Sequence, residues 1–291
     1  MNGILLVDKP AGLSSAAVVR LVKKTLKADK IGHLGTLDPF ASGLLPLCVG
    51  TGTKIAQFLM AEHKAYSGVI RLGVETDTLD ATGTVTRTAS LPRENESGLR
   101  SLEDRFLGEQ WQTPPMYSAL KRNGVPLYKL ARRGETVERE PRKIWIERFS
   151  LAMIDAGLLG FSLTCSKGTY VRVLAADIGE MLGCGAHLVT LRRTGFGEFD
   201  IADALSLQTL VDRTVDISRF LLSPKQAMRH YPVVRISSEA TTQLRQGRQE
   251  VLRQLSCMTD ERAIAVLLDP EDELVAVVEN QQNQWRLARV L

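Results

Sequence analysis

The residues best suited to chemistry lie in one segment rich in glycine and proline near the start of the chain. Residues 31–46 read IGHLGTLDPFASGLLP, with three glycines, two prolines and one carboxylate, Asp38. Such a segment can form a shaped loop whose backbone approaches a ligand closely. Because Asp38 precedes Pro39, its backbone is biased towards an extended conformation. An Asp-Pro pair also fits an ordinary turn, so the local pattern alone leaves both interpretations open.

A strand and a helix are expected just before this segment. Residues 3–7 form an apolar run that suits a buried strand. Ser14 or Ser15 is a suitable N-cap for the helix that follows. Apolar residues recur in that helix with the spacing of one helical face, and basic residues occupy the other side. The apolar set is Val18, Leu21, Val22 and Leu26, and the basic set is Arg20, Lys23, Lys24 and Lys27.

The middle of the chain mixes strand and helix patterns. Strands are predicted at residues 66–72, 84–88 and 161–165, and helices at 98–107, 171–182 and 203–213. Because hairpin-like strands alternate irregularly with helices, the order favours an α+β fold over a regular β-α-β chain. We therefore expect a mixed, largely antiparallel central sheet with surrounding helices.

The pattern changes near residues 223–232, after which a short β-rich module is predicted. Its expected elements are a helix at residues 238–246 and strands at 262–268, 273–279 and 284–290. The length of the chain also suits two domains. We therefore predict one domain at residues 1–230 and a small β-rich accessory domain at 233–291.

The charge of the chain is unevenly distributed. The formal net charge is +4, yet residues 121–148 alone carry nine Lys/Arg against four Asp/Glu. Residues 233–291 carry seven against nine, a balance of −2. A basic segment can attract a polyanion such as RNA, and it also fits a solvated surface loop. Charge alone does not separate these two interpretations.

The cysteines and the apolar runs argue against several classes of protein. The four cysteines form no C-x-x-C pair, so no disulfide framework or zinc ribbon is indicated. The nearest set of metal ligands is Cys165 with Cys184 and His187, and reduced core residues explain it better. No basic leader opens the chain, and no apolar run approaches the ~20 residues of a membrane helix. We expect a cytoplasmic protein without a membrane segment.

Seven segments, in order along the chain, resemble the motifs of the TruB family, the bacterial tRNA pseudouridine-55 synthases. The resemblance covers residues 3 to about 200, and the segments are jointly highly specific. They are residues 6–15, 31–46, 64–66 with 72–83, 114–121, 165–172, 183–187 and 191–193. One departure is Leu34, where the family commonly has Thr.

The resemblance implies a pseudouridine-synthase fold and isomerisation of a uridine in the T-loop of tRNA, at position 55. Asp38 matches the catalytic aspartate, which interacts covalently with the substrate. Arg172 matches the arginine that keeps this carboxylate ionised in a dry pocket, and Asp80 the acid that positions the arginine. Without the resemblance, Arg172 fits a surface ion pair and Asp80 a turn. No metal or organic cofactor is implied.

Five further residues match substrate-binding positions of the family. Tyr66 matches the residue that stacks on the target base and is a candidate for proton transfer, although a core tyrosine fits the local pattern. Tyr170 and Leu191 match pocket residues, and ordinary packing also fits them. His33 matches the residue that fills the space of the flipped-out nucleotide. Lys9 matches the floor of the site, with a solvated turn lysine as the alternative.

The resemblance also implies how RNA is bound. An insertion at about residues 114–148 is expected to close over the T-arm and elbow of tRNA, and residues 233–291 weakly resemble a PUA-type domain. We expect a monomer with no obligatory protein partner. An RNA chaperone and a synthase for another RNA are the rival interpretations, and a carboxylate hydrolase fits poorly. We therefore expect five residues to converge in a single cleft: Asp38, Tyr66, Asp80, Arg172 and His33.

Overall fold

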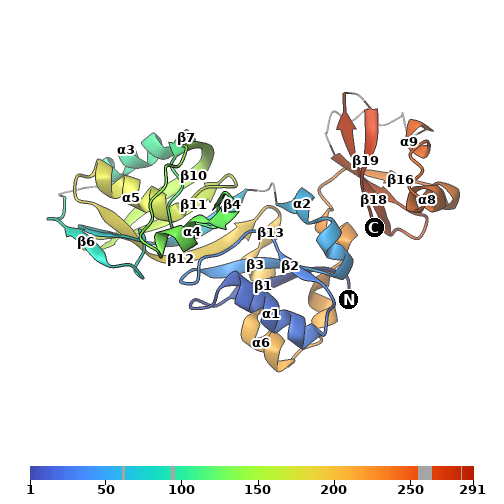
Figure 1. Cartoon of the computed structure of the whole chain (residues 1–291), viewed down its shortest axis with the longest axis horizontal. Helices are drawn as coiled ribbons and strands as arrows, with labels where there is room; N and C mark the ends of the chain where they lie inside the picture. The colour runs from blue at the N-terminus through green and yellow to red at the C-terminus, as the bar shows by residue number, and fades with distance from the viewer. Residues whose placement is uncertain (61–62, 93–95, 255–263, 283) are drawn as a thin grey trace. The chain divides into compact units, whose positions relative to one another are not determined.

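The computed structural model describes the chain except for residues 61–62, 93–95, 255–263 and 283 (Figure 1). The chain divides into two compact units. The terminal unit consists of Met1–Asp38, Leu44–Ala61 and Glu198–Leu291, and the central unit of Pro39–Gly43 and Glu62–Gly197. In the described parts of both units, no helix is long and apolar enough to cross a membrane.

The first part of the terminal unit is a small mixed sheet with short helices. Strand β1 pairs in parallel with β14 and antiparallel with β15, and β2 pairs antiparallel with β3. Its elements are β1 (Gly3–Lys9), α1 (Ser15–Leu26), β2 (Ile31–His33), β3 (Ser42–Val49), η1 (Gly50–Lys54), α2 (Ala56–Leu59), β13 (Phe199–Asp200), η2 (Ile201–Asp203), β14 (Leu205–Ser206), α6 (Leu207–Asp212), η3 (Ile217–Phe220), β15 (Leu221–Leu222) and α7 (Pro224–Ala227).

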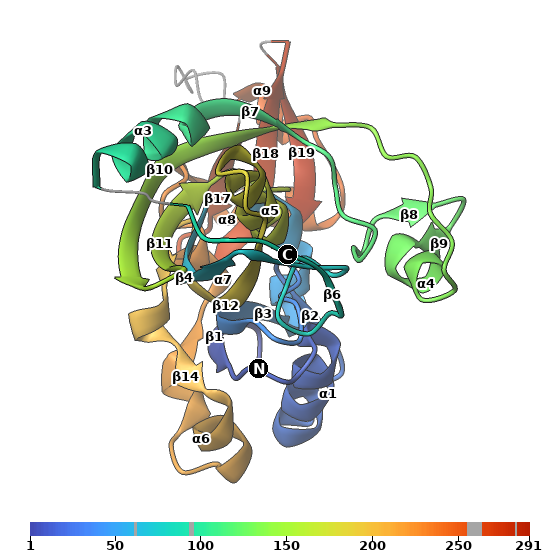
Figure 2. The ribbon, with the colours of Figure 1, turned by 90° about the vertical axis from the view of Figure 1, so that its left-hand side faces the viewer.

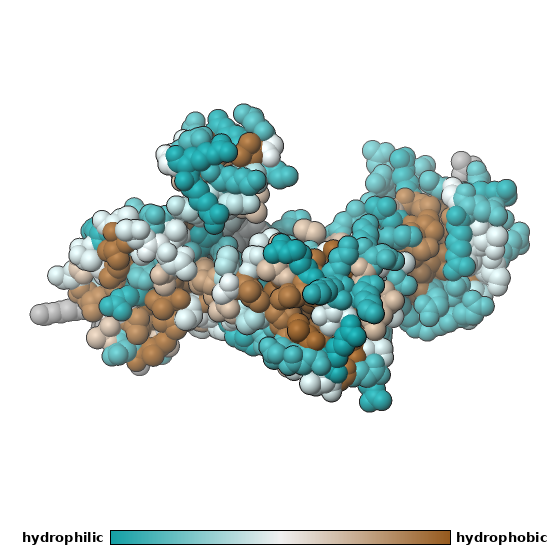
Figure 3. Space-filling model, turned by 60° about the horizontal axis from the view of Figure 1, so that its bottom comes forward, coloured by the Kyte–Doolittle hydropathy of each residue, from teal (hydrophilic) through white to brown (hydrophobic). Residues whose placement is uncertain are grey.

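The rest of the terminal unit is a four-stranded sheet with two helices, and here it is called the C-terminal module. Strand β16 is parallel to β17, and β17, β18 and β19 are antiparallel. Its elements are β16 (Val233–Arg235), α8 (Ser238–Arg245), α9 (Val251–Gln254), β17 (Ile264–Leu268), β18 (Leu274–Gln281) and β19 (Gln284–Val290). The predicted helix and strands are present, except that residues 262–263 lie outside the described residues. Figure 3 shows a strip of apolar surface on this module between polar rims.

The central unit is built on a long antiparallel sheet with the order β12-β4-β11-β10-β7. Helix α3 packs along β10, and α5 packs along β12. The elements are β4 (Lys64–Leu72), β5 (Val74–Thr76), β6 (Val85–Thr88), α3 (Glu96–Phe106), β7 (Gly108–Gln112), β8 (Lys121–Arg122), β9 (Val125–Pro126), α4 (Leu127–Ala131), β10 (Arg142–Asp155), β11 (Leu158–Cys165), α5 (Val171–Met181) and β12 (Ala186–Phe196). Figure 2 shows β8, β9 and α4 standing apart from this sheet.

The predicted α+β fold with a mixed, largely antiparallel sheet is confirmed. Two predicted elements need correction. The helix expected at 203–213 begins only at Leu207, because the Ser206 side chain accepts a hydrogen bond from the Thr209 N–H and caps it there. The basic segment 121–148 is not one loop, because the sheet strand β10 starts at Arg142.

The two adjacent serines before α1 have different roles. Ser14 is the N-cap, and its hydroxyl accepts a hydrogen bond of 3.2 Å from the Ala17 N–H. Ser15 is buried, and its hydroxyl accepts from the Leu37 N–H at 2.8 Å and donates to the Leu37 C=O at 3.0 Å. The residue next to Asp38 is therefore held by a side chain 22 positions earlier in the chain.

The fixing of Leu37 leads to a first prediction. Ser15→Ala should lower the free energy of unfolding by about 1–3 kcal/mol, because it leaves a buried N–H and a buried C=O without this partner. Urea denaturation measures the change. The matched control is Ser14→Gly, which removes only a helix cap and should cost only a few tenths of a kcal/mol. Equal losses in the two variants would contradict the anchoring role of Ser15.

Candidate active site

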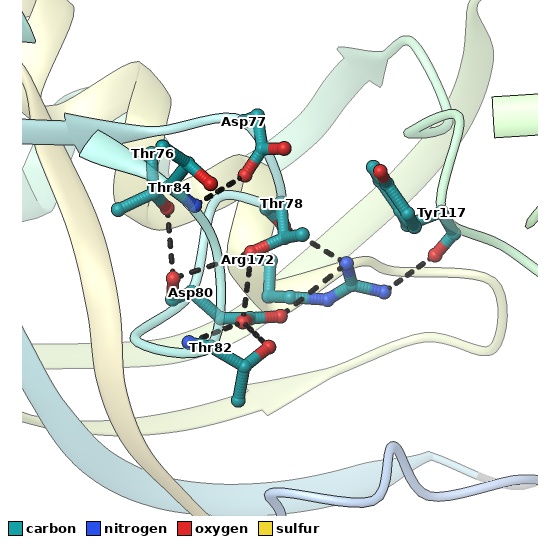
Figure 4. A network of polar contacts seen from close by, with 8 residues as sticks. All are labelled: Thr76, Asp77, Thr78, Asp80, Thr82, Thr84, Tyr117 and Arg172. Atoms are coloured by element: carbon teal, nitrogen blue, oxygen red, sulfur yellow. Dashed lines mark hydrogen bonds and ion pairs between the residues drawn. The ribbon is translucent and has the colours of Figure 1, made fainter. Parts of the chain in front are cut away.

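A buried ion pair lies at the start of α5. Arg172 is the second residue of this helix, and its Nη1 lies 3.6 Å from Oδ2 of Asp80, with the two side chains 5% and 6% exposed. Arg172 also donates to two backbone carbonyls, that of Thr78 at 3.0 Å and that of Tyr117 at 2.7 Å (Figure 4). The guanidinium is thus held between two loops, and its interpretation as a surface ion pair is wrong.

The loop between β5 and β6 presents Asp80 to this arginine. Oδ1 of Asp80 accepts hydrogen bonds from the Thr82 N–H at 2.9 Å, the Thr82 hydroxyl at 2.5 Å and the Thr78 hydroxyl at 2.9 Å. The Thr76 hydroxyl donates to the Asp80 carbonyl at 2.8 Å. One carboxylate oxygen therefore holds the loop together while the other faces Arg172 (Figure 4). These bonds offset the cost of burying the charge.

Tyr170 is fixed through its backbone by a residue that the sequence did not single out. The Gln112 side chain accepts from the Tyr170 N–H at 2.7 Å and donates to the Tyr170 C=O at 3.1 Å. Gln112 is 4% exposed at the end of β7. This pair of hydrogen bonds ties the residue that precedes α5 to the strand at the far edge of the sheet.

Tyr66 and Leu191 lie on neighbouring strands of the central sheet. Tyr66 is 8% exposed in β4, where it pairs with Leu163 of β11 and with Arg193 of β12. Leu191 is buried in β12 opposite Gly68. A Cβ at Gly68 would lie 2.2 Å from the Thr190 carbonyl oxygen, so only glycine lets the two strands approach this closely here.

Lys9, His33 and Asp38 belong to the terminal unit. Lys9 is fully buried, so its interpretation as a solvated turn lysine is wrong, and its ammonium donates to the carbonyls of Pro10 at 2.9 Å and Leu13 at 2.6 Å. His33 ends β2 and pairs with Leu47 of β3. Asp38 directly follows the anchored Leu37 and precedes Pro39, the first residue of the central unit.

The short segment after Asp38 is attached to β12. Ser42 and Gly43 pair in parallel with Arg192 and Arg193. Gly43 has φ +102°, and a Cβ there would lie 2.3 Å from the Arg193 carbonyl oxygen. Because four peptide units separate Asp38 from Ser42, their Cα atoms are at most about 14 Å apart.

The close approach at Gly43 leads to a second prediction. Gly43→Ala should lower the free energy of unfolding by about 1–3 kcal/mol, because both the positive φ and the backbone contact exclude a side chain. Gly247→Ala is the matched control, since Gly247 has φ +81° and nothing within 4 Å of an added Cβ. Thermal unfolding measures both variants. Equal losses of stability in the two variants would show that the positive φ alone, and not the close backbone contact, requires glycine at position 43.

The structure brings Asp80 and Arg172 together and places Tyr66, Tyr170 and Leu191 in the same unit. The predicted convergence of these residues with Asp38 and His33 in one cleft stays a prediction, as does the place of Lys9 at the floor of the site. The sequence patterns indicate neither Gln112 nor Arg193, and Arg193 is the largest fully buried side chain among the described residues. The only signal for Arg193 was its place in the motif at residues 191–193.

The cysteines of the described residues are buried thiols. Burial raises the pKa of Cys165 to about 11 and that of Cys48 to about 12, which disfavours the reactive thiolate. The Cys184 thiol donates to the Gly185 carbonyl, and Nδ1 of His187 lies 2.8 Å from the Val74 carbonyl oxygen. Within the described part of the chain, no group of His, Cys, Asp or Glu could hold a metal ion.

Two family models match the chain in succession. The model described as "TruB family pseudouridylate synthase (N terminal domain)" matches residues 23–171, and "tRNA pseudouridylate synthase B C-terminal domain" matches residues 172–224. The chain also has similarity in fold to a chain in the crystal structure of a Cbf5–Nop10–Gar1 complex. That similarity has a TM-score of 0.71 and 25% sequence identity, and it covers 99% of this chain and 84% of the other.

Curated relatives match almost the whole chain. The tRNA pseudouridine synthase B of Burkholderia mallei is 45% identical over 280 residues, which cover 95% of this chain and 92% of the relative. The protein of the same name from Geobacter sulfurreducens is 45% identical over 249 residues, with 85% and 82% covered. The chain therefore belongs to the TruB family of pseudouridylate synthases.

Proposed function

We propose that this protein isomerises the uridine at position 55 in the T-loop of tRNA to pseudouridine, with Asp38 as the catalytic aspartate. The observation that carries the proposal is the buried Arg172–Asp80 pair of the central unit, because these two residues match the arginine and the second acid that the resemblance to the family implies. In the reaction the N1–C1′ bond breaks, the uracil rotates and a C5–C1′ bond forms. The proton lost from C5 is balanced by the one gained at N1.

We assign to Arg172 the role of keeping the Asp38 carboxylate ionised. A carboxylate in a pocket that excludes water is disfavoured in its ionised form, and a nearby guanidinium opposes this effect. The backbone acceptors on Thr78 and Tyr117 fix the direction of the guanidinium. Arg172 therefore needs little reorganisation when substrate arrives, as a preorganised electrostatic site requires.

The other matched residues are assigned to the flipped nucleotide. Tyr66 offers a ring for stacking on the base and a hydroxyl for proton transfer. Tyr170 and Leu191 line the base pocket, and Lys9 supports its floor. His33 occupies the space that the nucleotide leaves in the stack. Because a folded loop hides C5 and the sugar, the nucleotide must leave the stack before the reaction.

The insertion at about residues 114–148 is assigned to the RNA backbone. A cavity of about 500 Å³ in it is lined by four basic side chains and two acidic ones, among other residues. The basic set is Lys121, Arg122, Arg139 and Arg142, and the acidic set is Glu138 and Glu140. The excess of positive charge suits phosphate contacts. Through the Tyr117 carbonyl, the insertion is also bonded to Arg172.

We propose a catalytic domain at residues 1–230 followed by a PUA-like domain at 233–291 that adds little nonspecific phosphate affinity because of its charge of −2. We further propose a cytoplasmic monomer that acts on the T-arm and elbow of tRNA, without a metal, organic cofactor or obligatory protein partner.

Nucleotide-resolution mapping of pseudouridine tests the function. Unmodified tRNA transcript is incubated with the purified full chain, and a transcript with cytidine at position 55 serves as the control. We expect pseudouridine at position 55 of the first transcript and at no position of the second. Modification elsewhere with position 55 untouched would refute the substrate. No modification together with tight tRNA binding would favour an RNA chaperone.

A further inference from the structure

Arg193 is an arginine buried in strand β12. It is 1% exposed and is the largest of the fully buried side chains. It lies in β12 between two neighbours in register, Gly43 of β3 on one side and Tyr66 of β4 on the other. Arg193 has no role in the proposed function, although burying a guanidinium is costly unless its hydrogen bonds are satisfied.

The side chain of Arg193 is directed to Tyr66. Directly opposed residues of antiparallel strands point to the same face of a sheet, so Arg193 and Tyr66 share a face. A side-chain hydrogen bond joins them, in which the guanidinium donates to the phenol oxygen. Cζ of Arg193 also lies 5.3 Å from the ring centre of Phe196. Arg193 and Phe196 both lie in β12, and a β-bulge between Arg193 and Gly195 separates them.

The electrostatics of the pair agree with this geometry. Burial lowers the pKa of the Arg193 guanidinium, and Tyr66 raises it through charge and through the hydrogen bond. An arginine side chain nevertheless stays protonated in proteins. Arg193 thus presents a fixed positive charge to the hydroxyl of Tyr66, and a hydrogen bond from a charged donor is stronger than one between neutral groups.

We infer that Arg193 is the positioning residue for Tyr66. Its guanidinium holds the phenol oxygen, sets the plane of the ring for the target base, and stabilises negative charge on that oxygen while Tyr66 transfers a proton. The inference deepens the proposed function and rests on it, because it requires Tyr66 to act on the flipped nucleotide. Arg193 itself need not touch the RNA.

A double-mutant cycle in single-turnover rates tests the inference. The variants of the full chain are Arg193→Met, which keeps an unbranched side chain without a donor, Tyr66→Phe, and the two combined. With enzyme in excess over unmodified tRNA, Arg193→Met should slow pseudouridine formation about 10- to 100-fold. In the Tyr66→Phe background the same change should slow it less than about threefold, because the acceptor is already gone. The Kd for tRNA should change little in every variant.

The controls separate positioning from structure. Arg71→Met, at an exposed position of the adjacent strand β4, should keep the wild-type rate. The free energy of unfolding is measured for the wild type, Arg193→Met, Tyr66→Phe and the double variant, which gives a second double-mutant cycle. Coupling in stability without coupling in rate would show a purely structural contact and overturn the inference. Equal slowing by Arg193→Met in both backgrounds would also overturn it.

Two further measurements keep the outcome decisive. If Arg193→Met does not fold, Arg193→Lys replaces it in the cycle. Lysine keeps the charge but not the planar donor geometry, so partial slowing supports the inference and a wild-type rate overturns it. If the wild-type chain leaves tRNA unmodified, the proposed function fails, whereas the contact between Arg193 and Tyr66 remains measurable in the unfolding cycle. The two failures are therefore distinguishable.

Discussion

Asp38→Asn is expected to reduce the single-turnover rate of pseudouridine formation by about 10⁴-fold or more, as loss of a covalent catalyst does. The side chains are nearly isosteric, but the amide is a poor nucleophile and lacks the charge that Arg172 stabilises in the proposed mechanism. Rapid-quench sampling followed by detection of pseudouridine at position 55 measures the rate. The same variant should bind tRNA within about threefold of the wild type, because phosphate contacts elsewhere supply most of the affinity.

Two comparisons make the Asp38 result specific. Asp29→Asn changes an exposed carboxylate earlier in the terminal unit and should leave the rate unchanged. Thermal unfolding of Asp38→Asn should match the wild type, since Leu37 remains held by Ser15. Normal turnover by Asp38→Asn would remove the aspartate from the mechanism. Loss of tRNA binding in step with the rate would instead point to a role in folding the loop.

Much of the fold could be predicted from short periodic patterns. Helices α1 and α5 have one apolar face and clear ends, at Ser14 and near Gly183, so their boundaries agree with the structure to within a few residues. Strand β10 shows where such patterns fail. Its outer face carries charged residues and its alternation is broken by a bulge between Ile146 and Arg148, so half of it resembled a basic loop.

In the candidate site, too, some residues could be predicted from the sequence and others could not. Asp38, Tyr66, Asp80 and Arg172 are proposed as site residues because they lie in motifs that resemble a family, whereas composition and spacing left each of them ambiguous. Gln112 acts through its side chain on a backbone 58 positions away, and a single glutamine in a strand carries no sign of this. Tertiary contacts of this kind arise from strand order, which local patterns do not specify.

Arg172→Met should lower both stability and activity. The substitution leaves the Asp80 carboxylate buried without its ion-pair partner and removes the donor to the carbonyls of Thr78 and Tyr117. We expect the free energy of unfolding to fall by about 3–5 kcal/mol. The single-turnover rate should fall by about 10²-fold or more, because in the proposed mechanism Arg172 supplies the counter-charge of Asp38. Urea denaturation and rapid-quench assays measure the two effects separately.

The double variant Arg172→Met with Asp80→Asn separates these effects. Neutralising Asp80 removes the uncompensated charge, so the double variant should be more stable than Arg172→Met alone. It should stay as slow as the single variant, because restoring stability does not restore the guanidinium. Asp77→Asn is the control in the same loop, since Asp77 is exposed and accepts only the Thr84 N–H among the bonds drawn in Figure 4. A double variant that regains wild-type turnover would limit Arg172 to a structural role and leave the ionisation of Asp38 to another cation.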